Sequence, residues 1–310
     1  MRILSFIYYL ITSLRNFLYD KGIFRVKRVP GVEIICIGNI TVGGTGKTPA
    51  VQYFSKRLQK MGRKVAVVSR GYRGKRKREP LLVSDGREIF ATTRESGDEP
   101  FLHALNLHKI PIIVSSNRYK GCLFAKKHFN VDTIILDDGF QHRKLGRNRD
   151  IVLIDATNPF GWGQLLPLGM LREDFKKAAK RASEFIITKS DLVSEREVER
   201  IKKYLKKKLN KEVSTAKHGV TSLCDLKGNA KPLFWIKDKR VLLFSGLANP
   251  LNFEKTVISL EPSYIERVDF MDHHNFKKKD IVFYSSGIPV YVIAGRVIWR
   301  LRAEKIEKEW

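Results

Sequence analysis

A short glycine-rich segment that follows an apolar run constrains the fold of this chain more than any other feature. Residues 38–49 read Gly-Asn-Ile-Thr-Val-Gly-Gly-Thr-Gly-Lys-Thr-Pro, and the apolar run Glu33–Ile37 precedes them. Glycines let successive backbone N–H groups converge on one anion, while Lys47 adds a positive charge and Thr48 adds a hydroxyl that can ligate Mg²⁺. A helix-like stretch, Pro49–Met61, comes next. A strand, a glycine-rich loop and a helix in this order predict a site for a nucleoside triphosphate.

The segment departs from the phosphate-loop pattern at one position. That pattern asks for glycine where this chain has Thr41, but residues 42–48 keep the part that contacts phosphates. The alternative is a glycine-rich surface turn that Lys-Thr follows by chance. The strand-like and helix-like flanks favour the nucleotide site. The residues that we expect to bind the nucleotide are Thr41, Val42, Gly43, Gly44, Thr45, Gly46, Lys47 and Thr48.

Past this loop, short β-branched runs alternate with helical stretches, which is typical of a doubly wound α/β fold with a mostly parallel sheet. The runs are almost continuously apolar, as parallel strands covered on both faces are. A chain of 310 residues exceeds one typical domain, so we expect a nucleotide-binding domain over residues 21–215 and a smaller α/β domain over residues 216–310. The predicted strands are Lys64–Ser69, Ile110–Ser115, Val131–Leu136, Asp150–Asp155 and Glu184–Thr188.

Polar, turn-prone motifs follow each of these runs. They are Ser69-Arg70-Gly71-Tyr72-Arg73-Gly74, Ser115-Ser116-Asn117-Arg118, Asp137-Asp138-Gly139-Phe140-Gln141-His142, Ala156-Thr157-Asn158-Pro159-Phe160-Gly161 and Thr188-Lys189-Ser190-Asp191. In doubly wound sheets, ligands bind beyond the carboxyl ends of the strands. Any one motif alone is compatible with an ordinary turn. Together, at the edge that carries the glycine-rich loop, they predict one composite site.

Two of these motifs carry a more specific signal. The apolar run that ends in Asp137 and Asp138 looks like a Walker B element, which delivers a carboxylate close to Mg²⁺. Adjacent residues of a strand point to opposite faces, so we expect only one of the two aspartates to be close to the metal. Thr188–Asp191 resembles the Thr-Lys-x-Asp sequence that reads guanine, which leaves contact with the nucleotide base open.

The charge balance predicts an anionic partner. The chain has 59 Lys and Arg against 32 Asp and Glu, a formal charge of +27, and its 43% apolar content excludes disorder. The basic runs are Arg73–Arg78, Lys202–Lys208 and Lys277–Lys279, of which the last two are equally compatible with solvated helix faces. No nucleic-acid-binding pattern accompanies them, and aromatic residues are not interleaved with the first run. We therefore expect lipid or a phosphorylated small molecule and no nucleic acid.

The N-terminal segment, residues 1–20, combines aromatic and aliphatic residues with a few basic ones. Its uncharged stretch Ile3–Leu14 makes a helix about 18 Å long, too short for the ~30 Å core of a bilayer. An amphipathic helix lying on a membrane surface fits better, with Arg2 and Arg15 available to anionic headgroups. The alternative is a helix packed against its own domain.

Several motifs occur in order up to about residue 280. They are Gly38-Asn39 with Val42–Pro49, Ser69–Tyr72, Gly97-Asp98-Glu99-Pro100, Asp137–His142, Leu166–Glu173, Phe244–Pro250 and Asp272-His273-His274-Asn275-Phe276. Taken together, these motifs resemble the tetraacyldisaccharide 4′-kinases of lipid A biosynthesis. The rival hypotheses are a basic ATPase or GTPase that acts on nucleic acid and a regulatory GTPase.

The resemblance implies a peripheral enzyme on the cytoplasmic face of the inner membrane. Such an enzyme uses MgATP to phosphorylate the 4′-hydroxyl of an acylated glucosamine disaccharide 1-phosphate, giving lipid IVA. The resemblance also implies two α/β/α domains joined by a short β linker, with the smaller one closing over the lipid cleft. Its base dyad falls on Asp98 and His273, with His274 as the alternative histidine. An alcohol attacks poorly until a base accepts its proton, although Asp98 also suits a helix cap.

The remaining candidates are polar residues of the motif loops. Arginine's planar fork suits phosphate, either the one being transferred or the substrate's 1-phosphate. The expected catalytic residues are Asp98, His273 and Lys47. The expected metal ligands are Thr48, Asp137, Asp138 and Glu173. The expected substrate contacts are Arg70, Arg73, Arg118, Gln141, His142, Arg172 and His274.

Overall fold

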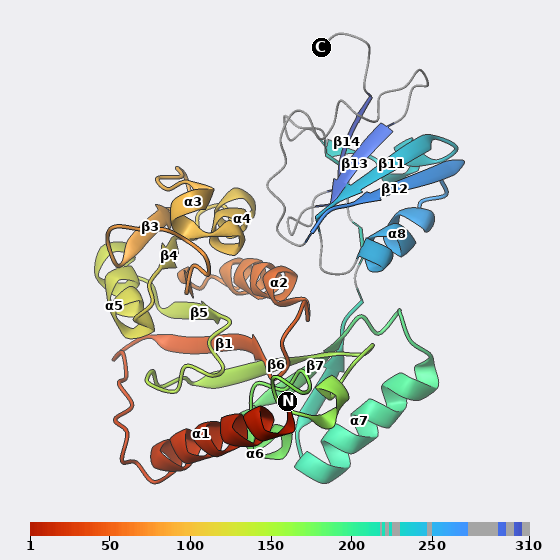
Figure 1. Ribbon diagram of the computed structural model, residues 1–310. Coiled ribbons are helices and arrows are strands. Elements are labelled where there is room, and N and C mark those ends of the chain that lie inside the picture. Colours follow the sequence, from red (N-terminus) through yellow and green to blue (C-terminus); the bar gives the residue numbers. More distant parts are fainter. Residues whose placement is uncertain are drawn as a thin grey trace. The chain divides into compact units, whose positions relative to one another are not determined.

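A computed structural model describes residues 1–217, 219–220, 223–224, 230–246 and 250–271, together with the backbone of two further strands, β13 (Tyr291–Gly295) and β14 (Leu301–Lys305). The chain divides into two compact units, residues 1–218 and residues 219–310 (Figure 1). The phosphate-binding motifs up to Thr188–Asp191 all belong to the first unit.

The first unit is built on an eight-stranded sheet with the order β3-β4-β2-β5-β1-β6-β7-β8. Every neighbouring pair is parallel except β3 and β4, so the carboxyl ends of the parallel strands meet at one edge. The predicted α/β class with a mainly parallel sheet is confirmed. The strands are β1 (Glu33–Asn39), β2 (Val65–Ser69), β3 (Leu81–Ser84), β4 (Ile112–Val114), β5 (Thr133–Asp137), β6 (Arg149–Asp155), β7 (Glu184–Thr188) and β8 (Glu212–Thr215).

Helices cover both faces of this sheet, because alternate residues of each strand point to opposite sides. Ile35 and Ile37 of β1 belong to the same core cluster as Val51 of α2. Ile34 belongs to the other cluster, with Ala125 of α5. The helices of the unit are α1 (Arg2–Asp20), α2 (Lys47–Lys60), α3 (Thr93–Ser96), α4 (Asp98–Asn106), α5 (Arg118–Phe129), α6 (Phe175–Arg181) and α7 (Glu195–Leu209). Figure 1 shows α1 beside α6 and on the opposite side of the sheet from α2.

Two strands of the sheet lacked a clear signal in the sequence. β3 is a four-residue antiparallel edge strand, too short to show a period. β8 is the other edge strand and is largely exposed, so it lacks the apolar run that marks a parallel strand covered on both faces. The other strands fall where we predicted them, with ends that differ by at most two residues at positions shared with loops.

The second unit holds a six-stranded sheet with the order β10-β9-β14-β13-β11-β12. Its strand β11 (Arg240–Ser245) is flanked in parallel by β12 (Tyr264–Asp269) and β13. Strands β9 (Leu223–Cys224) and β10 (Ala230–Lys231) form a short antiparallel pair, and helix α8 (Pro250–Ile258) follows β11. Among the described residues of this unit, one buried apolar cluster contains Leu223, Ile236, Val241, Leu243 and Val257.

Candidate active site

The phosphate loop, residues 41–48, joins the carboxyl end of β1 to the first turn of α2. Its residue Gly46 caps α2 with φ of 83°, a left-handed conformation that glycine adopts without strain. The amide of Asn39 donates to the hydroxyl of Thr45 at 2.9 Å, and the hydroxyl of Thr188 donates to the carbonyl of Thr45 at 2.9 Å. The ends of β1 and β7 therefore hold the loop from two sides. Lys47 is buried within it.

A second segment pairs with the phosphate loop through the backbone. The Val42 N–H donates to the carbonyl of Met170, and the Arg172 N–H donates to the carbonyl of Ile40, both at 2.8 Å. These bonds place the Leu166–Glu173 motif against the loop, although the bonded residues are 128 and 132 positions apart in the sequence. The 165–173 segment is thus held directly against the phosphate loop.

Asp137 ends β5 and Asp138 lies directly after it, and their carboxylates make different contacts. Asp137 is buried, and its Oδ2 lies 3.2 Å from the Ser69 hydroxyl and 3.4 Å from Nε2 of His103. Asp138 has φ of 50°, so its carboxylate turns toward the phosphate loop. Its Oδ1 lies 3.9 Å from Nζ of Lys47 and 3.1 Å from Nη1 of Arg172.

Charges at this edge perturb each other strongly. Burial opposes ionisation of Asp137, but the contacts with His103, the charge of Lys47 and the hydrogen bond from Ser69 together lower the pKa of this carboxyl. Burial and then the charge of Asp137 raise the pKa of Glu99 to about 7. Perturbed carboxyls in one place are typical of functional sites. Glu99 and His103 were not among the predicted site residues, although their spacing of four residues puts both on one face of α4.

Positive charge gathers on the loops that follow β2, β4 and β5. Arg118 begins α5 and is buried; its Nη1 donates to the carbonyl of Ser116 at 3.1 Å, and its Nε has no partner among the described residues. Burial and the charge of Arg70 lower the pKa of Arg118. Burial and the charge of Arg118 lower the pKa of His142 to about 4. The mutual repulsion of these cationic groups favours binding of an anion near them.

The motif loop of Arg70 packs closely on the segment that leads to Asp98. Gly97 caps α4 with φ of 87°, and a Cβ there would lie 2.6 Å from the carbonyl oxygen of Tyr72. Because Gly97 and not Asp98 is the N-cap, the carboxylate of Asp98 stands in the first turn of α4. Arg70 and Arg73 are exposed beside this contact.

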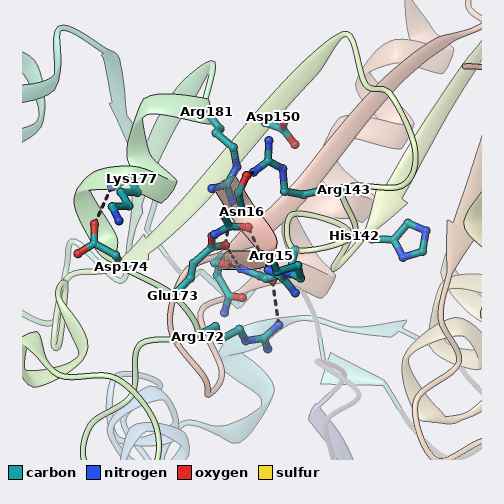
Figure 2. Close-up of polar contacts among 12 residues, drawn as sticks. Arg15, Asn16, His142, Arg143, Asp150, Arg172, Glu173, Asp174, Lys177 and Arg181 are labelled. Atoms are coloured by element: carbon teal, nitrogen blue, oxygen red, sulfur yellow. Dashed lines mark hydrogen bonds and ion pairs between the residues drawn. The ribbon is translucent and has the colours of Figure 1, made fainter. Parts of the chain in front are cut away.

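Glu173, an expected metal ligand, is bonded to protein donors. It is fully buried, and both of its carboxylate oxygens accept from protein donors (Figure 2). The donors are Asn16 at 2.7 Å, Arg181 at 2.9 Å and Gln141 at 3.3 Å. Asn16 was not among the predicted site residues. His273 and His274 lie outside the described residues.

The class of protein is that of phosphate-loop phosphotransferases. It is defined by a strand that leads into a phosphate loop with a buried lysine, and by a neighbouring strand that ends in aspartates. The family model of tetraacyldisaccharide-1-P 4′-kinase (LpxK) matches residues 1–293. This chain belongs to the tetraacyldisaccharide 4′-kinase family.

Relatives agree with this assignment over most of their length. The tetraacyldisaccharide 4′-kinase of Halothermothrix orenii is 39% identical over 295 residues, covering 90% of this chain and 75% of the relative. That of Syntrophus aciditrophicus is 37% identical over 290 residues, covering 91% and 77%. The crystal structure of the "apo" form of LpxK from Aquifex aeolicus in complex with ATP has a TM-score of 0.75 and 31% identity, covering 96% of this chain and 87% of that one.

Proposed function

We propose that this chain transfers the γ-phosphate of ATP to the 4′-hydroxyl of a tetraacylated glucosamine disaccharide 1-phosphate, giving lipid IVA. Family membership makes the chain a tetraacyldisaccharide 4′-kinase. The observation that carries the proposal is the buried Lys47, which lies 3.9 Å from Asp138 at the carboxyl end of the central strands. The relative from Aquifex aeolicus, which was crystallised with ATP, supports this choice of nucleotide.

The acidic end of β5 and the start of α2 suit Mg²⁺. Asp137 Oδ1 is buried and has no hydrogen-bond partner in the described part of the chain. A buried carboxylate oxygen of this kind is suited to bind a cation directly or through a water molecule. Within the described residues, no cluster of three or more His, Cys, Asp or Glu could hold a metal alone. Mg²⁺ commonly takes only one or two protein ligands beside phosphate and water, so this set fits. Thr48 and Asp137 would hold the ion, with Asp138 as the alternative carboxylate, and the ion would offset phosphate charge when bound.

The cations divide into two groups. Arg172 reaches the phosphate loop through its ion pair with Asp138, so we assign it to the phosphate in transfer. We assign Arg118 and Arg70, with His142 near them, to the substrate's own phosphate, because no carboxylate of the described residues accepts from the Arg118 guanidinium. Arg73 stays a predicted contact of a phosphate, and Gln141 stays a predicted residue of the sugar or metal environment. For Glu173 we propose a supporting role at this edge, because Asn16, Arg181 and Gln141 already donate to its carboxylate.

We propose that Asp98 is the base that accepts the proton of the attacking 4′-hydroxyl. Its position in the first turn of α4, directly after the tight Gly97–Tyr72 contact, fixes the backbone that carries the carboxylate. A carboxylate paired with an imidazole accepts a hydroxyl proton at neutral pH. His273 is the proposed imidazole, and His274 is the alternative.

Helix α1 supports attachment to the cytoplasmic face of the inner membrane. Its side chains that face the protein are polar, namely Ser5, Thr12 and Asn16. Its exposed side chains include Ile3, Leu4, Phe6, Ile7, Leu10, Ile11, Leu14 and Phe17. Among the described helices, none combines the length and apolar character needed to cross a bilayer. An apolar face turned to solvent on a helix that does not span is typical of an interfacial helix.

The proposal is tested by transfer of label. The full chain is incubated with γ-labelled ATP, Mg²⁺ and tetraacyl disaccharide 1-phosphate in mixed detergent micelles, with Lys47→Ala as the matched control. We expect label in the lipid with the native chain only. Hydrolysis of ATP without lipid labelling would contradict the assigned acceptor, and preference for GTP would contradict the assigned donor.

A further inference from the structure

The polar side of α1 contacts the same segment that pairs with the phosphate loop. The Ser5 hydroxyl donates to the carbonyl of Leu165 at 3.0 Å, and the Tyr8 hydroxyl donates to the carbonyl of Arg172 at 2.8 Å. The Asn16 amide donates to Glu173 at 2.7 Å. The 165–173 segment therefore lies between α1 and the phosphate loop, bonded to both.

Side chains continue this connection as far as the lysine of the phosphate loop. Gln141 donates to Glu173 at 3.3 Å and accepts from Nη1 of Arg172, also at 3.3 Å. The same Nη1 contacts Asp138 at 3.1 Å, and Asp138 lies 3.9 Å from Lys47. Glu173 accepts short, charge-assisted hydrogen bonds from Asn16 at 2.7 Å and from Arg181 at 2.9 Å, so its carboxylate is the most strongly held group in this series of contacts.

The C-terminal half of α1 is also tied to the loop after β5. Arg143 donates to the carbonyl of Asn16 at 3.0 Å and pairs with Asp20 at 2.6 Å. Figure 2 shows Asn16 between Arg143 and Glu173. Asn16 is only 4% exposed on a helix whose apolar residues face outward. Burial of a polar amide is unfavourable unless it is hydrogen-bonded, so an amide at this place indicates a specific contact and not general packing.

We propose that α1 positions the active site as well as attaching the protein to lipid, and that Tyr8 and Asn16 are positioning residues. They act through the 165–173 segment, which they hold so that Arg172 lies against Asp138 and the phosphate loop. The inference rests on the role proposed above for Arg172. It assigns the two faces of α1 separate tasks: the apolar face binds the membrane surface, and the polar face sets the geometry for phosphoryl transfer.

Two substitutions on the polar face test the inference, with a third as matched control. Tyr8→Phe removes only the hydroxyl that donates to Arg172, and Asn16→Leu removes the donor to Glu173 in a side chain of similar size. Thr12→Val is the control, because the Thr12 hydroxyl lies in the same buried stripe but donates only to carbonyls of α1 itself, those of Tyr8 and Tyr9. Each variant is measured for kcat and KM in mixed micelles and for sedimentation with phosphatidylglycerol–phosphatidylethanolamine vesicles.

We expect Tyr8→Phe and Asn16→Leu to lower kcat by on the order of 10- to 100-fold at saturating lipid and ATP, since small misplacement of a positioning group has effects of that size. Vesicle binding should match that of Thr12→Val. Ile11→Ser on the apolar face should do the reverse, weakening vesicle binding and raising the KM for lipid with kcat retained. If Tyr8→Phe and Asn16→Leu change only the KM for lipid or vesicle binding, α1 is an anchor alone and the inference is overturned.

A double-mutant cycle separates this inference from the role of Arg172. In an Arg172→Lys background, which keeps the charge and loses the planar fork, Asn16→Leu should have almost no further effect on kcat, because both act through one group. Losses that multiply would overturn the coupling through Arg172. Full activity of Arg172→Lys and Arg172→Ala would instead refute the proposed function of that arginine.

Discussion

Replacement of Gly97 by alanine is expected to damage both the fold and the reaction. Gly97 has φ of 87° and ψ of 164°, a region that is essentially restricted to glycine. A Cβ added there would lie 2.6 Å from the carbonyl oxygen of Tyr72, and a backbone atom cannot move away as the end of a side chain can. The next residue is Asp98, the proposed base. Relief of the contact therefore moves either the Tyr72 loop or the start of α4.

The loss of stability in Gly97→Ala follows from the backbone conformation and from the close contact with Tyr72. The backbone conformation alone costs a non-glycine residue about 1–3 kcal/mol, and the contact adds to it. For a unit of this size, 1 kcal/mol lowers Tm by about 2–4 °C, so Gly97→Ala should lower Tm by about 5–10 °C. A displaced Asp98 should lower kcat on the order of 10- to 100-fold.

Gly62→Ala is the matched control for backbone strain. Gly62 has φ of 83°, but nothing lies within 4 Å of its added Cβ, so only strain of about 1 kcal/mol is expected. Thermal unfolding is followed by circular dichroism, and kcat is measured well below both transitions. Equal shifts of Tm in the two variants, with an unchanged kcat for Gly97→Ala, would refute the close packing of Gly97 on Tyr72 as a determinant of the site.

Three further outcomes are expected. Lys47→Ala should abolish phosphoryl transfer with native circular dichroism, because it removes the buried charge at the phosphates; activity near the native level would contradict the nucleotide site. The pKa of His142 is about 4 in the folded chain and about 6.5 in the unfolded chain, so the unfolded chain binds more protons between these pH values. The contribution of His142 to the free energy of unfolding is therefore full above pH 6.5 and is lost as the pH falls toward 4. An anion bound at Arg118 should raise the pKa of His142, which is measured by NMR titration with and without inorganic phosphate. A pKa of His142 that phosphate leaves unchanged would argue against an anion site. Asp98→Ala should lower kcat by about 10²–10⁴-fold with little change in ATP affinity. The double mutant with His273→Ala should lose much less kcat than the product of the two single losses, whereas losses of kcat that multiply would argue against the dyad.

The position of the phosphate loop and of its strands could be predicted because the signals are local. A run of apolar residues, glycines at set spacing and a following helix are properties of adjacent residues, and each strand ends where its polar motif begins. β7 falls on the predicted Glu184–Thr188 for this reason. The outward apolar face of α1 was equally visible as a periodic pattern.

The sequence by itself therefore determined the class of fold, the phosphate site and the edge of the sheet at which polar residues meet. Only the tertiary structure decided which groups touch: that Asp138 and not Asp137 turns to Lys47, that His103 pairs with Asp137, and that Asn16 bonds to Glu173. The direction of Asp138 depends on a positive φ that no local pattern announces. The Asn16–Glu173 contact joins residues 157 positions apart, and sequence spacing carries no information on such a pair because the packing of α1, the sheet and the 165–173 segment together sets it.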